Sequence, residues 1–293
     1  MCGGGAAPVY SASDAPDSVG FPPLIRIDAA RLQPGGRAVT LIAVTRPVSP
    51  SLGDCELTHL ARVPLDAGAA IAQHRAYEKL LESLGALIVR APAAPEYPDA
   101  VFIEDTAIVL DEVVVVTRPG ASARRGEPDA VAEVLARYRR VVAMASPATM
   151  DGGDVIRVGR RLFVGRSSRT NDAGIEALRG LVAEYEYEVV PVEFAGCLHL
   201  KSAATAVADS VLLVNPTWVA ATAFPGCDAM PVDPREPSGA NALRLADVLV
   251  YASQFPRTRE VLEEYGLKVA ALDYSELAKA EGAVTCCSLV LDA

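Results

Sequence analysis

The chain has 293 residues, of which 51% are hydrophobic, and a formal net charge of −10. This length is sufficient for one large domain or two small ones with a sizeable core. The negative charge argues against nucleic acid and anionic membranes as partners. Charges and turn formers interrupt every stretch of about 18 residues, so we expect no transmembrane helix.

Residues 1–35 are rich in Gly, Ala, Ser and Pro and lack the basic start and continuous apolar segment of a secretory signal. We therefore expect a loosely ordered extension over residues 1–37, a single domain over 38–293, and a cytoplasmic, reducing location. The six cysteines, at positions 2, 55, 197, 227, 286 and 287, are not spaced as metal ligands. Neither a disulfide framework nor a zinc site is expected.

Apolar runs of strand length alternate with amphipathic helical stretches along the whole chain. Four helices are predicted, over 66–83, 127–139, 171–184 and 257–265, with Asp66 as N-cap and Gly85 as C-cap of the first. The predicted strands are AVTLIAV, ALIVRAP, AVFIEDTAIVL, EVVVVT, RVVAM, LFVG, YEVVPV, AVADSVLLVN, ADVLVYA and KVAALD.

A unit of strand, strand, helix, strand thus recurs at least four times, with almost no sequence identity between the units. This indicates an α/β fold built from structural repeats. A doubly wound sheet is the alternative, but no glycine-rich phosphate loop lies between a strand and a helix.

Several carboxylates interrupt the run YPDAVFIEDTAIVL, namely Asp99, Glu104 and Asp105. Adjacent strand residues point to opposite faces, so Glu104 and Asp105 can share one ligand only if the strand ends or bends there. A solvated edge strand is the alternative interpretation. Further along, the motif MDGGDV predicts a tight turn leading into a strand, with Asp151 at its start.

A cysteine nucleophile needs a base to form its thiolate and a carboxylate to orient that base. Cys286, His199 and Asp151 are the candidates for these three positions, and they come from separate repeats. His199 is placed at the head of a strand, where a general acid–base residue can reach a cleft. The acidic cluster of Asp99, Glu104 and Asp105 matches the forked donors of a guanidinium group, which favours a guanidine substrate over an acyl substrate.

Six motifs occur in the order found in dimethylarginine dimethylaminohydrolases of the guanidine-modifying (pentein) superfamily. They are PDAVFIEDTAIV, TRPGASARRGE, MDGGDV, FVGRSSRTN, LHLKS and VTCCS. The chain resembles this family from about Ala38 to Leu291. The resemblance implies a five-bladed α/β propeller with pseudo-fivefold symmetry around a central site, no cofactor, and hydrolysis of Nω,Nω-dimethyl-L-arginine, or the monomethyl form, to citrulline and an alkylamine.

The resemblance also implies roles for single residues. Cys286 matches the nucleophile, with Cys287 as a non-catalytic neighbour, His199 the acid–base residue, and Asp151 its carboxylate partner. The residues that match substrate-binding positions are Asp99, Glu104 and Asp105 for the cationic groups, with Asp105 the first choice for the guanidinium, Arg124 and Arg169 for the α-carboxylate, Leu57 in a lid loop, and Ala280 as a backbone contact. Glu281 departs from the family, which has an aspartate five residues before the nucleophile.

Two other functions fit parts of this pattern. Arginine deiminases have HLD where this chain has HLK, and the 31 residues between Gly120 and Gly152 leave no room for their inserted helical region. A non-catalytic binding protein of the same fold has no need to keep cysteine, histidine and carboxylate together.

Overall fold

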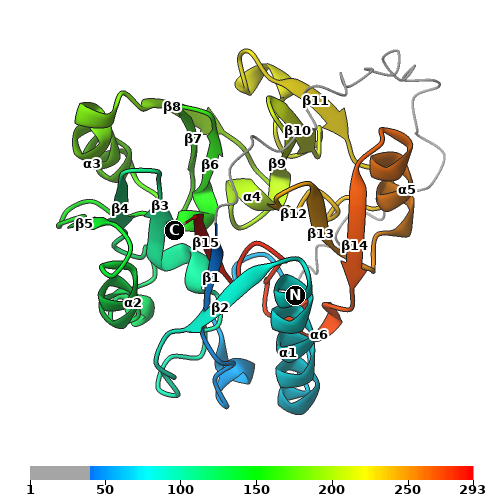
Figure 1. The fold of residues 1–293 in the computed structure, drawn as a ribbon, viewed down its shortest axis with the longest axis horizontal. Coiled ribbons are helices and arrows are strands. Elements are labelled where there is room, and N and C mark those ends of the chain that lie inside the picture. The colour runs from blue at the N-terminus through cyan, green and yellow to red at the C-terminus, as the bar shows by residue number, and fades with distance from the viewer. Residues whose placement is uncertain (1–39, 293) are drawn as a thin grey trace, which may run out of the picture.

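The computed structural model describes residues 40–292, so the predicted extension at 1–37 lies outside the described residues. Its 15 strands form five three-stranded sheets arranged around a centre (Figure 1). In every sheet the middle strand pairs antiparallel with the inner strand and parallel with the outer one. The predicted five-bladed propeller is confirmed.

The blades follow one another along the chain, except that the last strand completes the first blade. Strand β15 pairs with β1 in the register Leu41 to Asp292, so the two ends of the described chain close the ring. From inner to outer strand, the blades are β15 (Leu289–Asp292), β1 (Leu41–Thr45) and β2 (Ala86–Arg90); β3 (Ala107–Val109), β4 (Val113–Val116) and β5 (Arg140–Ala143); β6 (Val155–Val158), β7 (Arg161–Arg166) and β8 (Glu188–Glu193); β9 (Ala204–Ala208), β10 (Val211–Val214) and β11 (Asp228–Pro231); β12 (Ala242–Leu245), β13 (Val248–Ala252) and β14 (Lys268–Leu272).

Helices connect the middle and outer strands of four blades, as predicted. The α-helices are α1 (Ala67–Ser83), α2 (Pro128–Leu135), α3 (Asp172–Val182), α4 (Leu200–Ala203), α5 (Pro256–Glu264) and α6 (Ser275–Ala278). The blade of β9–β11 has only a 3-10 turn, Ala221–Ala223, in the corresponding place. The sequence therefore shows no helical pattern in this blade.

Asp66 is the N-cap of the first helix, as predicted, whereas its C-cap is Leu84 and the predicted Gly85 is the next residue. The Asp66 side chain accepts the backbone N–H of Ala69 at 3.0 Å, and Gly85 follows the helix with a φ of 94°. The second predicted helix is too long, because regular helix ends at Leu135 and not at 139.

Apolar side chains pack into wedges between neighbouring blades. The described residues form five hydrophobic clusters, and each joins two adjacent blades; for example, Val113 and Val115 of β4 pack with Leu162 and Val164 of β7. At the axis, the five inner strands enclose a cavity of about 240 Å³. The ring therefore has no single central core, and loops at one end of the inner strands converge near its axis.

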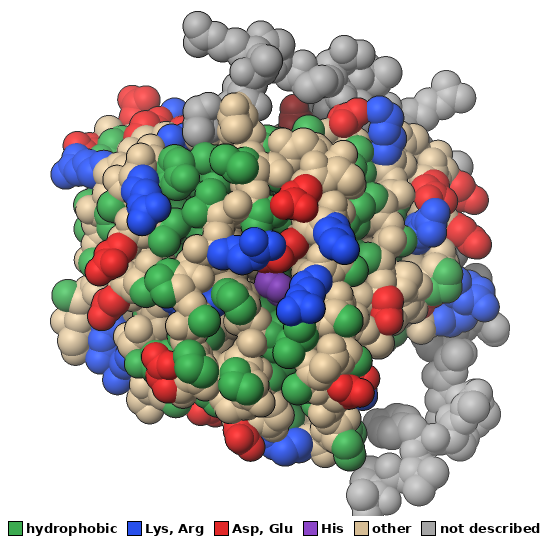
Figure 2. Space-filling model, turned by 60° about the horizontal axis from the view of Figure 1, so that its bottom comes forward, with side chains coloured by type: hydrophobic (Ala, Val, Ile, Leu, Met, Phe, Trp, Pro, Cys, Tyr) green, Lys and Arg blue, Asp and Glu red, His purple; other side chains and the backbone are tan. Residues whose placement is uncertain are grey.

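The outer surface carries charges of both signs. On the face in Figure 2, basic and acidic side chains alternate among small groups of hydrophobic side chains. No helix within residues 40–292 combines the length and the apolar character needed to cross a bilayer.

Candidate active site

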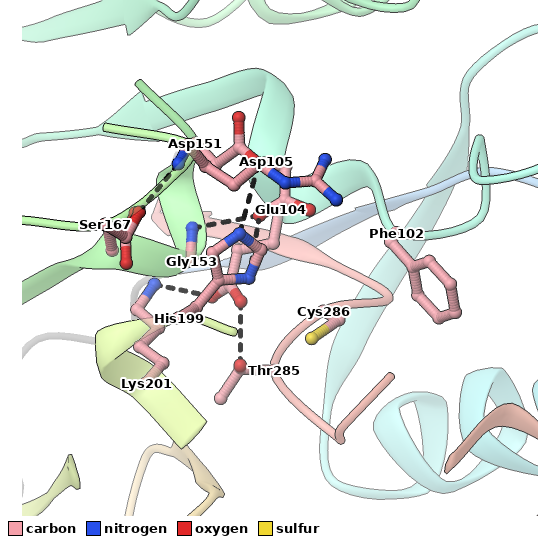
Figure 3. A network of polar contacts seen from close by, with 12 residues as sticks. Phe102, Glu104, Asp105, Asp151, Gly153, Ser167, His199, Lys201, Thr285 and Cys286 are labelled. Carbon is pink, nitrogen blue, oxygen red and sulfur yellow. Dashed lines mark hydrogen bonds and ion pairs between the residues drawn. The ribbon is translucent and has the colours of Figure 1, made fainter. Parts of the chain in front are cut away.

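The two neighbouring cysteines point to different environments. Cys286 borders a small cavity at the end of the ring axis, and Figure 3 shows its sulfur directed toward the His199 ring. Cys287 is fully buried, and its sulfur lies 2.7 Å from the Tyr274 hydroxyl. Burial raises the pKa of Cys287 to about 12. Only Cys286 is placed to react with a ligand in this cavity.

Backbone contacts position Cys286 at the turn before β15. The Ala283 N–H lies 3.3 Å from the Cys286 sulfur, and the Cys286 carbonyl accepts the N–H of Glu104 at 3.1 Å. Burial raises the pKa of the Cys286 thiol well above its usual range, and the carboxylates of Glu104 and Asp105 raise it further. The raised pKa favours the neutral thiol form of Cys286.

His199 immediately precedes the one-turn helix α4, which leads into β9. Its Nε2 lies 3.1 Å from Asp151 Oδ2, and its Nδ1 lies 3.8 Å from Asp105 Oδ1 (Figure 3). Burial lowers the pKa of His199, but these carboxylates, together with that of Asp154, outweigh burial and raise the pKa to about 9. At neutral pH the imidazole carries a proton that it can donate.

The two glycines of MDGGDV are needed for close packing against neighbouring groups and not for a positive φ. They lie in a 3-10 turn, Gly152–Asp154, and neither adopts a positive φ. A Cβ added at Gly153 would lie 2.6 Å from His199 Nδ1, so only glycine leaves the imidazole its place. The predicted turn leading into a strand is confirmed.

Asp105 and Glu104 lie in a 3-10 turn, Ile103–Thr106, where the sequence predicted a continuous strand from 100 to 110. Regular strand begins only at Ala107. Both carboxylates are buried, which contradicts the solvated edge strand. In this turn, unlike in a strand, two consecutive side chains need not point to opposite faces of a sheet.

Asp105 reaches the cavity and is held there by a buried ion pair. Its Oδ2 accepts Arg124 Nη1 at 2.6 Å, and its Oδ1 accepts the Gly153 N–H at 3.0 Å. Burial acts to raise the pKa of Asp105, but His199 and Arg124 outweigh burial and lower it. Asp105 is consequently an anion beside the thiol.

Arg124 makes more contacts within the protein than its predicted role implies. Its guanidinium donates to Asp105, to both carboxylate oxygens of Glu127, and to the carbonyls of Asp99 and Phe102. Arg124 borders the cavity, but most of its donors are already engaged. Glu127, which the sequence analysis did not identify as part of the site, is the buried counterion on its far side.

Glu104 turns away from this cavity. Its carboxylate accepts Lys201 Nζ at 2.5 Å and the Thr285 hydroxyl at 2.7 Å, and it borders the axial cavity instead. Through Thr285, the neighbour of Cys286, it supports the nucleophile loop. This arrangement does not favour a direct contact between Glu104 and a ligand.

Of the remaining predicted substrate residues, Asp99, Arg169 and Ala280 line the cavity and Leu57 does not. Asp99 Oδ2 accepts the Glu56 N–H at 3.1 Å, and burial raises the pKa of Asp99. Arg169 donates through Nη2 to the Thr58 hydroxyl at 3.1 Å. Leu57 is half-buried and packs on the hydrophobic cluster between the first and last blades, outside the cavity lining.

Most of the predicted set therefore meets in one place. The cavity is lined by Cys286, His199, Asp105, Asp99, Arg124, Arg169 and Ala280, together with Glu56, Phe102, Leu198 and Glu281. Asp151 lies behind His199. Asp105, Asp151 and His199 also place one donor atom each within 4.8 Å of one another, which is the set that could hold a metal ion.

The family model described as "N,N dimethylarginine dimethylhydrolase, eukaryotic" matches residues 65–222, more than half of the chain. The N(G),N(G)-dimethylarginine dimethylaminohydrolase of Streptomyces coelicolor is 37% identical over 252 residues, which cover 85% of this chain and 96% of that protein. The protein of the same name from Pseudomonas aeruginosa is 30% identical over 226 residues, covering 76% of this chain and 89% of the relative.

Solved structures have the same architecture. The Pseudomonas aeruginosa enzyme, as a cysteine-to-serine mutant complexed with citrulline, has a TM-score of 0.82 at 28% identity and covers 86% of this chain and 100% of its own. The N-terminal domain of ArgZ, an arginine dihydrolase from cyanobacteria, has a TM-score of 0.76 at 21% identity, which shows the fold alone. The match over most of both chains and the matching family model together show that this chain belongs to the dimethylarginine dimethylaminohydrolase family.

Proposed function

We propose that the protein hydrolyses Nω,Nω-dimethyl-L-arginine, and the monomethyl form, to L-citrulline and dimethylamine or methylamine. One observation carries the proposal: Cys286, His199 and Asp105 border the same cavity, and Asp151 contacts the far nitrogen of the histidine. These are a nucleophile, a proton donor and an anion for a cationic substrate.

Substrate binding would place a positive charge next to Cys286 and so favour its thiolate form. A guanidinium beside Asp105 brings a positive charge next to Cys286, and a nearby cation lowers the pKa of a thiol. Asp105 retains acceptor capacity for this, because each carboxylate oxygen has two lone pairs. Arg169 is the better candidate for the substrate carboxylate, since the donors of Arg124 are mostly engaged.

In the first step, the Cys286 thiol releases its proton to solvent once the guanidinium is bound, because His199 already carries its own. The resulting thiolate forms a bond to the guanidinium carbon, and the bond from that carbon to the methylated nitrogen breaks. His199 donates its proton to the departing amine, which leaves a covalent thiouronium intermediate. In the second step, His199 accepts a proton from water as the water oxygen bonds to the same carbon. The bond from carbon to sulfur then breaks, citrulline leaves, and no cofactor takes part.

The test is a panel of dimethylarginine, monomethylarginine, arginine and agmatine, with citrulline and amine measured separately. We expect citrulline from the two methylated arginines and none from Cys286→Ser. Turnover of arginine above that of dimethylarginine would contradict the proposed substrate. Near-normal citrulline release by Cys286→Ser would contradict the nucleophile.

A further inference from the structure

A loop without regular secondary structure covers the cavity on one side. We call residues 56–62 the lid segment. Glu56 lines the catalytic cavity, and His59 and Leu60 line a neighbouring cavity of about 400 Å³. Glu281 and Leu198 border both spaces and therefore lie between them.

The Glu281 carboxylate accepts three consecutive backbone N–H groups of the lid segment. The N–H of Thr58 lies 3.1 Å from both oxygens, that of His59 2.5 Å from Oε1, and that of Leu60 2.6 Å from Oε1. Successive backbone N–H groups that converge on one anion form a concave anion site, and bonds to an ionised acceptor are the strong kind. More than 220 residues separate the partners along the chain.

The backbone at Glu281 is in the left-handed region, with a φ of 57°. This conformation is uncommon for a residue with a side chain, and it persists where surrounding contacts maintain it. Here it directs the carboxylate to the lid segment. The glutamate side chain is long enough to reach all three N–H groups.

The lid segment also contacts two proposed substrate residues. Asp99 Oδ2 accepts the Glu56 N–H, and Arg169 donates to the Thr58 hydroxyl, each at 3.1 Å. Both side chains would exchange these bonds for bonds to a substrate. The position of the lid segment and the availability of Asp99 and Arg169 are therefore linked.

The enclosed space is too small for the proposed substrate. The catalytic cavity measures about 10 Å³, which is roughly the room that one water molecule requires. An arginine derivative can enter only after the lid segment moves. We infer that Glu281 is a positioning residue that anchors the lid segment over the active site through Thr58, His59 and Leu60, and so controls entry and release of the substrate; the kinetic part of this inference rests on the proposed function.

Hydrogen exchange of residues 56–62 tests the anchor without reference to activity. The variants are Glu281→Gln, which keeps shape but loses charge, and Glu281→Asp, which keeps charge but shortens the reach. Glu276→Gln is the matched control, because Glu276 also accepts a backbone N–H, that of Asp66 at 3.0 Å, but contacts no residue of the lid segment. We expect exchange at Thr58, His59 and Leu60 to accelerate at least tenfold in both Glu281 variants and to stay unchanged in the control.

Steady-state kinetics with dimethylarginine give the second measurement. A looser lid segment should raise KM at least fivefold in Glu281→Gln while kcat changes less than twofold. Unchanged exchange at these three amides would overturn the anchor whether or not the protein is active. A loss confined to kcat, with exchange unchanged, would assign Glu281 to the chemical step instead. Absence of turnover in the unmodified protein, with accelerated exchange in the variants, would contradict the proposed function and leave the anchor standing.

Discussion

The protonation of His199 links the catalytic site to the stability of the fold. Its pKa in the folded protein is about 9 against 6.5 for an ordinary histidine. At about 1.4 kcal/mol for each tenfold change in proton affinity, this difference corresponds to about 3 kcal/mol. Because the folded pKa is raised, this stabilisation is fully present below pH 6.5 and is lost as the pH rises through 9.

Urea unfolding of the unmodified protein and of His199→Asn at about pH 6 and about pH 10 measures this effect. The difference in free energy of unfolding between the two proteins should shrink by about 3 kcal/mol over that range. Groups whose pKa the substitution does not change contribute equally to both proteins, so their titration cancels in this difference. A difference that does not change with pH would refute the reasoning.

The chain has only three histidines, so NMR can follow the His199 ring directly, with His199→Asn identifying its signal. His74 provides a control of opposite sign. Burial lowers its pKa to about 4, so its contribution is present above pH 6.5 and is lost as the pH falls toward 4. A His199 signal that titrates near 6.5 would contradict the proposed ion pairs with its carboxylate neighbours.

Two further predictions concern glycine and cysteine positions. Gly153→Ala should lower kcat by more than tenfold, because its Cβ would lie 2.6 Å from the His199 ring. Gly180→Ala in α3, where nothing lies within 4 Å, should add roughly 0.5–1 kcal/mol of stability and leave activity unchanged. Equal activity of the two variants would contradict the proposed crowding of His199. Cys287→Ser should keep activity within threefold and lose about 1 kcal/mol of stability. Of this pair, iodoacetamide should label Cys286 and not the buried Cys287, which mass spectrometry checks. Loss of turnover in Cys287→Ser would show that the assignment of the pair is reversed.

Local patterns determined the elements and their repetition. The alternation of strand and helix runs predicted four blades, and Asp66 and Gly85 defined the ends of α1, because caps and periodicity depend on residues only a few positions apart. The fifth blade was not evident from these patterns and was implied only by the resemblance to the family. The types of residue needed at the site, a cysteine, a histidine and carboxylates, were also evident from the sequence.

Tertiary structure alone decided where those side chains point. Glu104 and Asp105 are neighbours in sequence, yet Lys201 and Thr285 hold one toward the axial cavity while Arg124 holds the other in the catalytic cavity. An apolar run gives no sign of the bend that separates them, because the stabilising contacts come from elsewhere in the chain. Arg124 donates to the carbonyls of Asp99 and Phe102 beside the bend.

The contact between Glu281 and the lid segment is a further example. It joins residues more than 220 positions apart, and closure of the ring by β15 brings them together. The sequence places a glutamate at position 281, but the direction of its carboxylate follows from a left-handed backbone and three N–H groups on a distant loop. Local sequence thus determined the elements and the chemistry available, and long-range packing determined which groups face one another.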